Sequence, residues 1–164
     1  MKVFVTGGNG FIGSRVVTRL VEEGHEVCLL LRETSRTDRL EGVPFGRFIG
    51  DVRDRDSLTT GMAGCDGVIH LASLSSWESM RSPLMREIVV DGTRNVLEAA
   101  RANGEASGEA SGAPRVVFVS SCTAIDGRQE PEVMTEETPF TLPPAPFVYA
   151  NAKDAKYLKS NMEQ

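Results

Sequence analysis

Tyr149 and Lys153 lie four residues apart near the end of the sequence, and their side chains could together move a proton. A spacing of four places two side chains on the same face of a helix. An ammonium group beside a phenol favours the phenolate, so such a pair can exchange a proton with an alcohol or a carbonyl. The same spacing also occurs by chance, and a pair of residues on a helix surface is the alternative interpretation.

The stretch VFVTGGNGFIGSRVV has glycines at positions 7, 10 and 13, in the pattern G-x-x-G-x-x-G. Gly7 allows a tight turn out of a strand, and Gly10 removes the side chain where a pyrophosphate must approach the backbone. Gly13 lets the following helix pack against the sheet. The N-terminus of that helix offers free N–H groups and the positive end of its dipole. A strand before the glycines and a helix after them predict a dinucleotide site; the alternative is a tight turn with a structural role only.

Short apolar runs alternate with longer segments of helical periodicity along the chain. Strands are predicted at Val3–Val5, Glu26–Leu31, Phe45–Asp51, Gly67–Ser73 and Arg115–Ser121, and helices at Phe11–Glu23, Arg55–Gly64, Leu84–Ala102 and from about Phe147. This alternation implies right-handed crossovers and a parallel sheet covered on both faces. We therefore predict one α/β domain over residues 1–164, with a Rossmann-type doubly wound sheet of about five strands in a three-layer αβα arrangement.

Several residues near the ends of these elements have a predicted structural role. Gly24 ends the first helix as a C-terminal glycine, and Asp54 or Asp56 lies near the N-terminus of the helix over residues 55–64. The sequence Gly-Glu-Ala-Ser occurs twice, at Gly104–Ser107 and Gly108–Ser111. Because these residues are small and polar, we expect a flexible surface loop there.

The composition is that of an ordinary globular protein, and the net charge of −5 does not suggest a nucleic-acid surface. Cys28, Cys65 and Cys122 are odd in number and form no metal-ligand cluster with His25 or His70. We expect three reduced core thiols and no bound metal. The sequence contains neither a leader pattern nor an apolar stretch of membrane-spanning length, so we expect a cytoplasmic protein without a membrane partner.

The glycine stretch TGGNGFIG resembles the short-chain dehydrogenase/reductase superfamily, in its extended or atypical extended branch. That branch includes NAD(P)-dependent sugar epimerases and dehydratases and dihydroflavonol-type reductases. The resemblance covers all 164 residues, because the later motifs follow in the expected order. It implies an NAD(P)-binding Rossmann domain and hydride transfer at a carbinol or ketone of a small molecule, such as a sugar nucleotide or a hydroxy-ketone.

The resemblance also implies a role for individual residues. Tyr149 is the acid/base, and Lys153 assists it and holds the nicotinamide ribose. The third member is a hydroxyl that polarises the substrate oxygen, which is Ser121 by the reductase pattern and Cys122 by the sugar-epimerase pattern. A thiol is a weak donor, so the second alignment predicts impaired chemistry. The implied cofactor-binding residues are Thr6, Gly7, Gly10, Phe11, Ile12, Gly13, Arg32, Asp51, Val52, Leu71, Ala72, Tyr149 and Lys153.

The choice of nucleotide depends on the end of the second strand. A carboxylate there binds the ribose hydroxyls of NAD, whereas this chain has Arg32, with Arg36 close by. A guanidinium pairs with a 2′-phosphate, which favours NADP over NAD, although it can also stack on adenine and Glu33 is adjacent. The resemblance implies that Asp51 binds the adenine amino group; a cap for the next helix is the alternative.

Two departures from the family pattern affect the prediction. Val89 stands where the family usually has an asparagine that supports the active-site region. The chain also stops soon after Lys153, so we expect the C-terminal part of the fold, with the substrate-binding region, to be missing. The fifth strand would then be an open sheet edge. A non-catalytic NADP(H)-binding module or an inactive truncated fragment is therefore the alternative to an active enzyme. The resemblance further implies a homodimer through the fourth and terminal helices.

Overall fold

The computed structural model describes residues 1–74, 76, 79, 82–107, 113–126, 132–135, 137–143 and 148–153. These residues belong to two compact units. The first unit comprises Met1–Ser73 and Asn95–Val119, and it contains the glycine stretch. The second unit comprises Leu74–Arg94 and Ser120–Gln164, and it contains Tyr149 and Lys153. The two groups of predicted site residues therefore belong to different units.

The first unit is built on a five-stranded parallel sheet with the strand order β3-β2-β1-β4-β5. The strands are β1 (Lys2–Thr6), β2 (Glu26–Leu31), β3 (Gly46–Ile49), β4 (Gly67–His70) and β5 (Arg115–Phe118). The chain proceeds outward from β1 to β3 and then returns to place β4 on the other side of β1. The strand order thus reverses between β1 and β4, where ligands bind in doubly wound sheets. The predicted fold class is confirmed.

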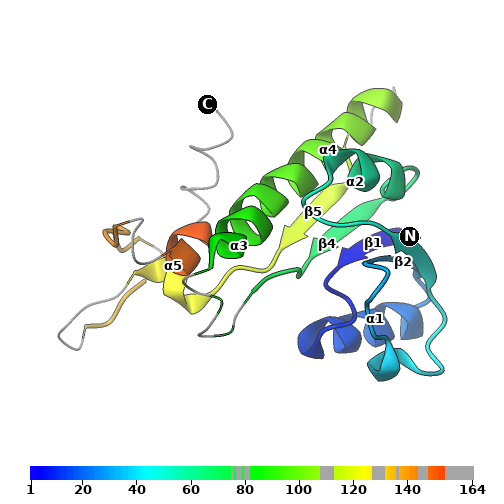
Figure 1. Ribbon diagram of the computed structural model, residues 1–164, viewed down its shortest axis with the longest axis horizontal. Helices are drawn as coiled ribbons and strands as arrows, with labels where there is room; N and C mark the ends of the chain where they lie inside the picture. Colours follow the sequence, from blue (N-terminus) through cyan, green and yellow to red (C-terminus); the bar gives the residue numbers. More distant parts are fainter. Residues whose placement is uncertain are drawn as a thin grey trace. The chain divides into compact units, whose positions relative to one another are not determined.

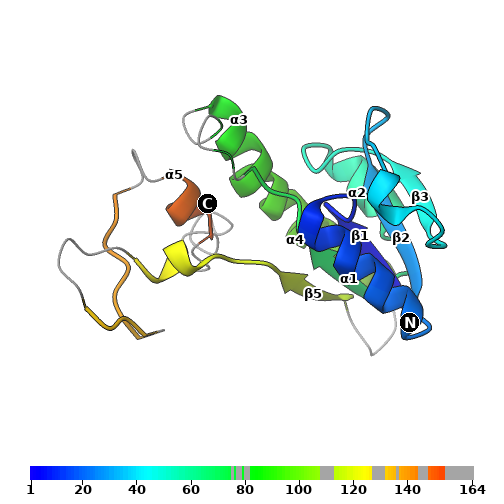
Figure 2. The ribbon, with the colours of Figure 1, turned by 90° about the horizontal axis from the view of Figure 1, so that it is seen from below.

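Helices cover both faces of this sheet, as Figures 1 and 2 show. The helix α1 (Phe11–Glu22) lies on one face, and α2 (Arg55–Gly61) with the α4 helix (Gly92–Ser107) lies on the other. Right-handed crossovers that run in opposite directions along a sheet place their helices on opposite faces. The three-layer arrangement predicted from the sequence is therefore present.

The side chains of β1 alternate between these two faces, as a buried parallel strand requires. Val3 and Val5 belong to a buried cluster that includes Val17 of α1. Phe4 faces the opposite layer, where its ring meets Phe48 edge-to-face at a centroid distance of 6.3 Å. A side chain at Gly61 of α2 would lie 2.8 Å from the Phe4 ring, so the glycine allows α2 to approach the sheet closely.

The element boundaries differ from the prediction mainly at the carboxyl ends of the strands. β3, β4 and β5 end at Ile49, His70 and Phe118, before the predicted ends at Asp51, Ser73 and Ser121. The residues after each strand have left the sheet, and these are the positions predicted to contact a ligand. Gly24 has a φ of +80°, which confirms its place at the end of α1.

The first Gly-Glu-Ala-Ser repeat is helical, which corrects the prediction of a loop. Residues Gly104–Ser107 form the last turn of α4. Glu105 pairs with Arg101 one turn earlier, with 3.4 Å between the charged atoms. A side chain at Gly104 would overlap the backbone of Ala113, so this glycine permits the chain to return close to the helix. The second repeat lies outside the described residues.

The predicted fourth helix is present, but its first part, which belongs to the second unit, is not regular. The helix α3 (Pro83–Met85) continues into a wider π-helical turn, η3 (Arg86–Asp91), before α4 begins at Gly92. Val89 and Val90 are buried in this turn. The Thr93 hydroxyl donates to the Val89 carbonyl oxygen at 2.6 Å. The 3₁₀ turn η4 (Cys122–Ile125) and the helix α5 (Val148–Lys153) complete the unit, and α5 packs against both η3 and η4. The start of α5 expected at Phe147 lies outside the described residues.

Two further expectations concern the burial of the cysteines and the lack of a membrane-spanning stretch. All three cysteines are free, but only Cys28 and Cys65 are half-buried; Cys122 is exposed on η4, which corrects its expected place in the core. Burial raises the pKa of the Cys28 and Cys65 thiols, which makes them less reactive. Within the described part of the chain, no helix has the length and apolar character needed to cross a membrane.

Candidate functional site

The glycine loop between β1 and α1 is closed by contacts between backbone atoms. Gly7 has a φ of +71°, and a side chain there would lie 2.6 Å from the backbone nitrogen of Ala72, beyond β4. The Gly10 amide donates to the Gly7 carbonyl oxygen at 3.1 Å. A side chain at Gly13 would overlap the same oxygen and approach Gly8. Gly13 therefore packs α1 against the loop itself, whereas the sequence predicted contact with the sheet.

The N-terminus of α1 is open in the way an anion site requires. Gly10 is the N-cap residue and supplies no side-chain hydrogen bond, and the first turn contains no acidic residue. The side chains of Phe11 and Ile12 are 79% and 61% exposed, which is unusual for large apolar residues beside a buried strand. The free N–H groups and the positive end of the dipole can thus receive phosphate oxygens.

The end of β4 is joined to the end of β1 by a buried polar contact. The Thr6 hydroxyl lies 2.6 Å from Nδ1 of His70 and accepts a hydrogen bond from the Ala72 amide at 3.3 Å. Thr6 and His70 are almost fully buried, and His70 stacks on Phe118 at a centroid distance of 5.9 Å. Thr6 therefore positions the Leu71–Ala72 segment beside Gly7. This agrees with the interpretation of His70 as a packed strand residue.

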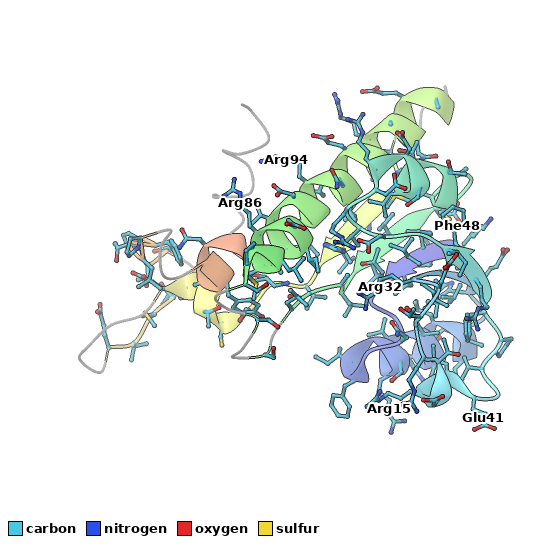
Figure 3. All side chains as sticks on the ribbon, in the orientation of Figure 1. Arg15, Arg32, Glu41, Phe48, Arg86 and Arg94 are labelled. Carbon is cyan, nitrogen blue, oxygen red and sulfur yellow. The ribbon has the colours of Figure 1, made fainter. Side chains whose placement is uncertain are left out.

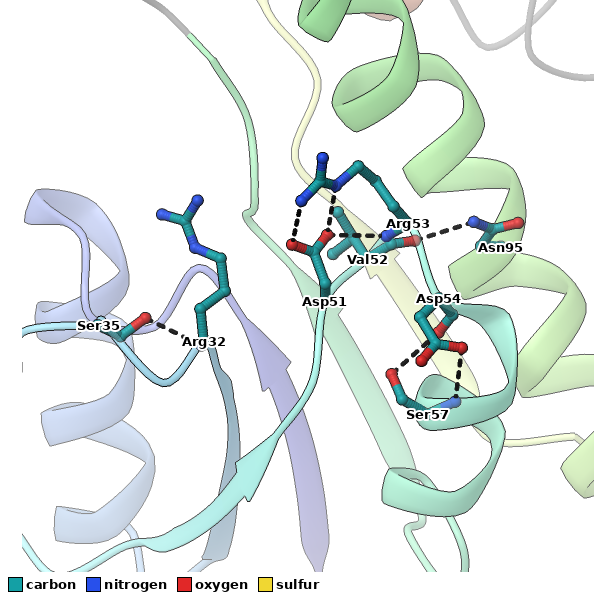
Figure 4. Close-up of polar contacts among 8 residues, drawn as sticks. All are labelled: Arg32, Ser35, Asp51, Val52, Arg53, Asp54, Ser57 and Asn95. Atoms are coloured by element: carbon teal, nitrogen blue, oxygen red, sulfur yellow. Dashed lines mark hydrogen bonds and ion pairs between the residues drawn. The ribbon is translucent and has the colours of Figure 1, made fainter.

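Asp51 and Asp54 have separate roles at the end of β3, as Figure 4 shows. The Asp54 carboxylate accepts hydrogen bonds from the amides of Asp56 and Ser57 and is the N-cap of α2. Asp51 instead accepts two hydrogen bonds from the Arg53 guanidinium, at 3.0 and 2.9 Å. The alternative role of Asp51 as the cap is therefore wrong.

Hydrogen bonds from Arg53 lower the pKa of the Asp51 carboxyl, and the nearby charge of Arg32 contributes to the same shift. Asp51 is half-buried and ionised, so it can accept a hydrogen bond from a ligand amino group. The neighbouring Val52 is buried, and its carbonyl oxygen accepts a hydrogen bond from Asn95 of α4 at 3.0 Å. Asp51 and Val52, which are expected to line the adenine site, are thus held in place by Arg53 and by Asn95.

The two arginines after β2 differ in their partners. The Arg32 side chain is exposed, and no described carboxylate lies within ion-pair distance of it, while its amide is bound to the Ser35 hydroxyl at 3.0 Å (Figure 4). Arg36 is paired with Asp38 at 2.8 Å. The Asn9 side chain donates to the Arg36 carbonyl oxygen and ties the glycine loop to this segment. Arg32 is the cation that remains available for a phosphate at this position.

In the second unit, Tyr149 and Lys153 lie on α5 as the spacing predicted. Nζ of Lys153 is 5.9 Å from the centre of the Tyr149 ring. Lys153 is only 4% exposed, and burial lowers its pKa from 10.5 to about 8. The Ser120 hydroxyl donates to the Lys153 carbonyl oxygen at 2.7 Å and fixes the end of this helical turn. A lysine with this pKa can gain or lose a proton near neutral pH.

Ser121 is held at the start of η4 in a defined orientation. Its hydroxyl oxygen accepts hydrogen bonds from the Thr123 amide at 3.3 Å and from the Thr123 hydroxyl at 3.0 Å. With both acceptor positions used, the Ser121 proton is available for another oxygen. The thiol of Cys122 is exposed on the next residue. The described contacts therefore favour Ser121 over Cys122 as a hydrogen-bond donor.

Three supporting residues were not predicted from the sequence. They are Ser120, Thr123 and Asn151, whose buried side chain donates to the carbonyl oxygens of Leu142 and Pro143 at 3.4 and 3.1 Å. Asn151 joins α5 to the preceding segment. No local pattern distinguishes these residues, because Ser120 and Asn151 bind carbonyl oxygens of other segments and Thr123 reaches the Ser121 hydroxyl through the fold of a turn.

The whole chain is similar to proteins of one family. Residues 3–158 match the NAD-dependent epimerase/dehydratase family. The chain is 40% identical over 134 residues to a putative dihydroflavonol 4-reductase of Synechocystis, with 79% of this chain and 36% of that protein covered. It is 37% identical over 153 residues to a UDP-glucose 4-epimerase of Streptomyces lividans, covering 89% of this chain and 43% of that protein.

Solved structures give the same result. The structure of the Thermus thermophilus UDP-glucose 4-epimerase in complex with NAD matches with a TM-score of 0.74 at 32% identity. That match covers 99% of this chain and 50% of the solved one. The chain thus spans about a third to a half of the length of these relatives.

Proposed function

The chain belongs to the NAD-dependent epimerase/dehydratase family, and from this premise we propose that it binds NADP(H) and transfers a hydride at a carbinol or ketone carbon, with Tyr149 as acid/base. The observation that carries the chemical part is the burial of Lys153 beside Tyr149, which brings the pKa of the lysine to about 8. A surface pair of residues without function has no need of a buried ammonium group.

The residues of the chain divide the work of such a reaction. In the direction of reduction, a bound nicotinamide supplies the hydride to the carbonyl carbon. Tyr149 gives its proton to the carbonyl oxygen as negative charge develops there, and Ser121 donates a hydrogen bond to the same oxygen. Lys153 then returns a proton to the tyrosine. The oxidation of an alcohol uses the same steps in reverse.

The cofactor-binding part of the proposal rests on the glycine loop and the α1 N-terminus. Arg32 supports NADP over NAD, because its exposed guanidinium follows β2 where a carboxylate would repel a 2′-phosphate. We expect tighter binding of NADPH than of NADH in calorimetric titrations. Exchange of Arg32 for aspartate should reverse that preference, whereas Arg47→Asp on the outer strand should leave it unchanged. Equal affinities in the unmodified chain would contradict the assignment to NADP.

Turnover is tested separately from binding. NADPH deuterated at C4 is incubated with aldehydes, ketones and nucleotide sugars, and deuterium in the products is measured by mass spectrometry. The unmodified chain should transfer deuterium, Tyr149→Phe and Lys153→Met should not, and Lys2→Met should behave as the unmodified chain. Tight cofactor binding without any transfer would support the alternative of a non-catalytic NADP(H)-binding module.

A further inference from the structure

Asp126, directly after η4, has a backbone conformation that its residue type seldom adopts. Its φ is +102° and its ψ is −170°, and among the described residues no other residue except glycine has a positive φ. This region of φ and ψ is essentially restricted to glycine, because a Cβ atom there crowds the backbone. Strain of this kind persists only where surrounding contacts impose it, and it is concentrated at functional sites.

The Asp126 side chain makes one such contact. It is 5% exposed, and its Oδ2 accepts a hydrogen bond from the Thr141 hydroxyl at 2.7 Å. A carboxyl group removed from water needs hydrogen-bond partners, so the contact with Thr141 is not an incidental one. It joins the end of η4 to a segment 15 residues later in the chain.

That segment is joined in turn to α5, so that three contacts form a closed ring. Asn151 of α5 donates to the carbonyl oxygens of the two residues that follow Thr141. Ser120, just before η4, donates to the carbonyl oxygen of Lys153 at the other end of α5. The turn η4 itself packs against α5 (Figure 3). Asp126 closes this ring at the end of η4.

The ring connects the two groups that must act together. Ser121 begins η4 and Tyr149 lies on α5, and in the proposed reaction both hydroxyls act on one substrate oxygen. We propose that Asp126 is a positioning residue for this pair: through Thr141 it holds α5, with Tyr149, against the turn that begins at Ser121. This role rests on the proposed function, because only that reaction requires the two hydroxyls to meet one oxygen. The strained backbone turns the Asp126 carboxyl toward Thr141.

Four variants separate the contact from its surroundings. Asp126→Gly removes the carboxyl group and relieves the backbone, and Thr141→Val removes the donor without a change at Asp126. Asp126→Asn keeps an oxygen that can accept the same hydrogen bond. Thr138→Val is the matched control, because Thr138 belongs to the same segment but its hydroxyl oxygen accepts from the Thr135 amide.

Hydrogen–deuterium exchange, measured by mass spectrometry, tests the contact without any turnover. Asp126→Gly and Thr141→Val should increase the exchange rate of the α5 amides at least about threefold, the effect of losing one hydrogen bond. Asp126→Asn and Thr138→Val should leave the α5 rate unchanged. If Asp126 shaped only its own turn, exchange would increase in η4 and not in α5.

Turnover with deuterated NADPH measures the positioning itself. In Asp126→Gly and Thr141→Val, kcat should fall about 10- to 100-fold, the effect of misplacing a reacting group. The affinity for NADPH, measured by calorimetry, should stay within about twofold, because the glycine loop belongs to the first unit. Asp126→Asn should recover most of the rate. A loss of folded protein alone would not lower kcat per folded chain and leave the asparagine variant active.

Three results would overturn the proposal: unchanged α5 exchange in both Asp126→Gly and Thr141→Val, full kcat in these variants of an active chain, or an equal loss in Thr138→Val. If the unmodified chain transfers no deuterium, the proposed function fails, and the α5 exchange alone decides whether Asp126 holds that helix. Circular dichroism establishes that each variant is folded. Should Asp126→Gly unfold, Thr141→Val provides both measurements, since this side chain is exposed.

Discussion

Gly10 and Gly13 lie three residues apart in one loop, yet the same substitution should affect them differently. A side chain at Gly13 would overlap the Gly7 carbonyl oxygen, whereas at Gly10 the closest atom within reach is the same oxygen, at 3.2 Å. We expect Gly13→Ala to lower the free energy of unfolding by about 1–3 kcal/mol, as overpacking does. Gly10→Ala should cost less than about 1 kcal/mol.

The substitution at Gly10 should affect cofactor binding more than it affects stability. The Gly10→Ala chain should be folded but bind NADPH at least about tenfold more weakly, because its methyl group occupies the approach of the pyrophosphate. Urea unfolding and calorimetric titration of the same samples measure both effects. If Gly10→Ala bound NADPH normally, the pyrophosphate could not lie over this part of the loop.

The lowered pKa of the buried Lys153 predicts that the stability of the chain depends on pH. Its pKa in the folded chain is about 8, against an ordinary value of 10.5. Between these values the unfolded chain holds more protons than the folded one, so the lysine's contribution to the free energy of unfolding rises with pH. Below pH 8 both states are protonated, and the cost of burying the ammonium group is present in full.

The Lys153→Met chain removes this titration. The unmodified chain should therefore gain stability relative to Lys153→Met as the pH increases from 8 to 10.5, and the two should change in parallel below pH 8. Urea unfolding at a series of pH values measures the difference. A constant difference across the whole range would show that Lys153 is not desolvated.

At the scale of the element, α2 depends on one aspartate. The Asp54 carboxylate accepts from two amides at the helix N-terminus, while Asp56 lies inside the first turn and contributes only its charge. Asp54→Ala should lower the free energy of unfolding by about 1 kcal/mol, the usual effect of losing an N-cap. Asp56→Ala should have a smaller effect that disappears in high salt. Equal losses from the two variants would contradict the assignment of Asp54 as the cap.

The π-helical turn η3 (Arg86–Asp91) is the second element to consider, because its backbone departs from a regular α-helix. Val89 is fully buried there, and its carbonyl oxygen receives the Thr93 hydroxyl at 2.6 Å. Wider turns of this kind occur frequently at functional sites, and α5 with its Tyr–Lys pair packs against this one. The turn forms here with valine at the position where the family usually has asparagine, so the asparagine is not needed for the wider turn.

At the scale of the whole molecule, the sheet ends at β5 among the described strands. Val117 on this strand is 51% exposed. An edge strand with an exposed apolar side chain favours association with another sheet edge. We expect the purified chain to aggregate slowly as its concentration rises, and Val117→Lys to slow this process, as measured by light scattering.

Leu84→Lys is the matched control for that experiment. Leu84 is 43% exposed, but it lies on the short helix α3 and not on a sheet edge. Its substitution should leave the aggregation rate unchanged. A homodimer through the fourth and terminal helices, which the family resemblance implies, would respond to Leu84→Lys instead, so the two variants distinguish the two kinds of association.

The alternation of strands and helices, the glycine loop and the helical spacing of Tyr149 and Lys153 could be predicted from the sequence alone. Each is a local pattern: buried strands are short apolar runs, a tight turn requires glycine, and a spacing of four gives one helix face. The resemblance carried by these motifs was sufficient to identify the family. Local patterns do not, however, indicate where each strand leaves the sheet, and the strand ends were predicted less well.

Only the tertiary structure decided which neighbouring groups meet. It assigned Asp54 and not Asp51 as the cap of α2, paired Arg36 with Asp38 and left Arg32 available. It also placed Thr6 against His70, 64 residues later in the chain, and buried Lys153. These outcomes depend on distances between segments that are far apart in the sequence. The pKa of a lysine and the partner of an arginine follow from burial and proximity, which no periodicity in the sequence contains.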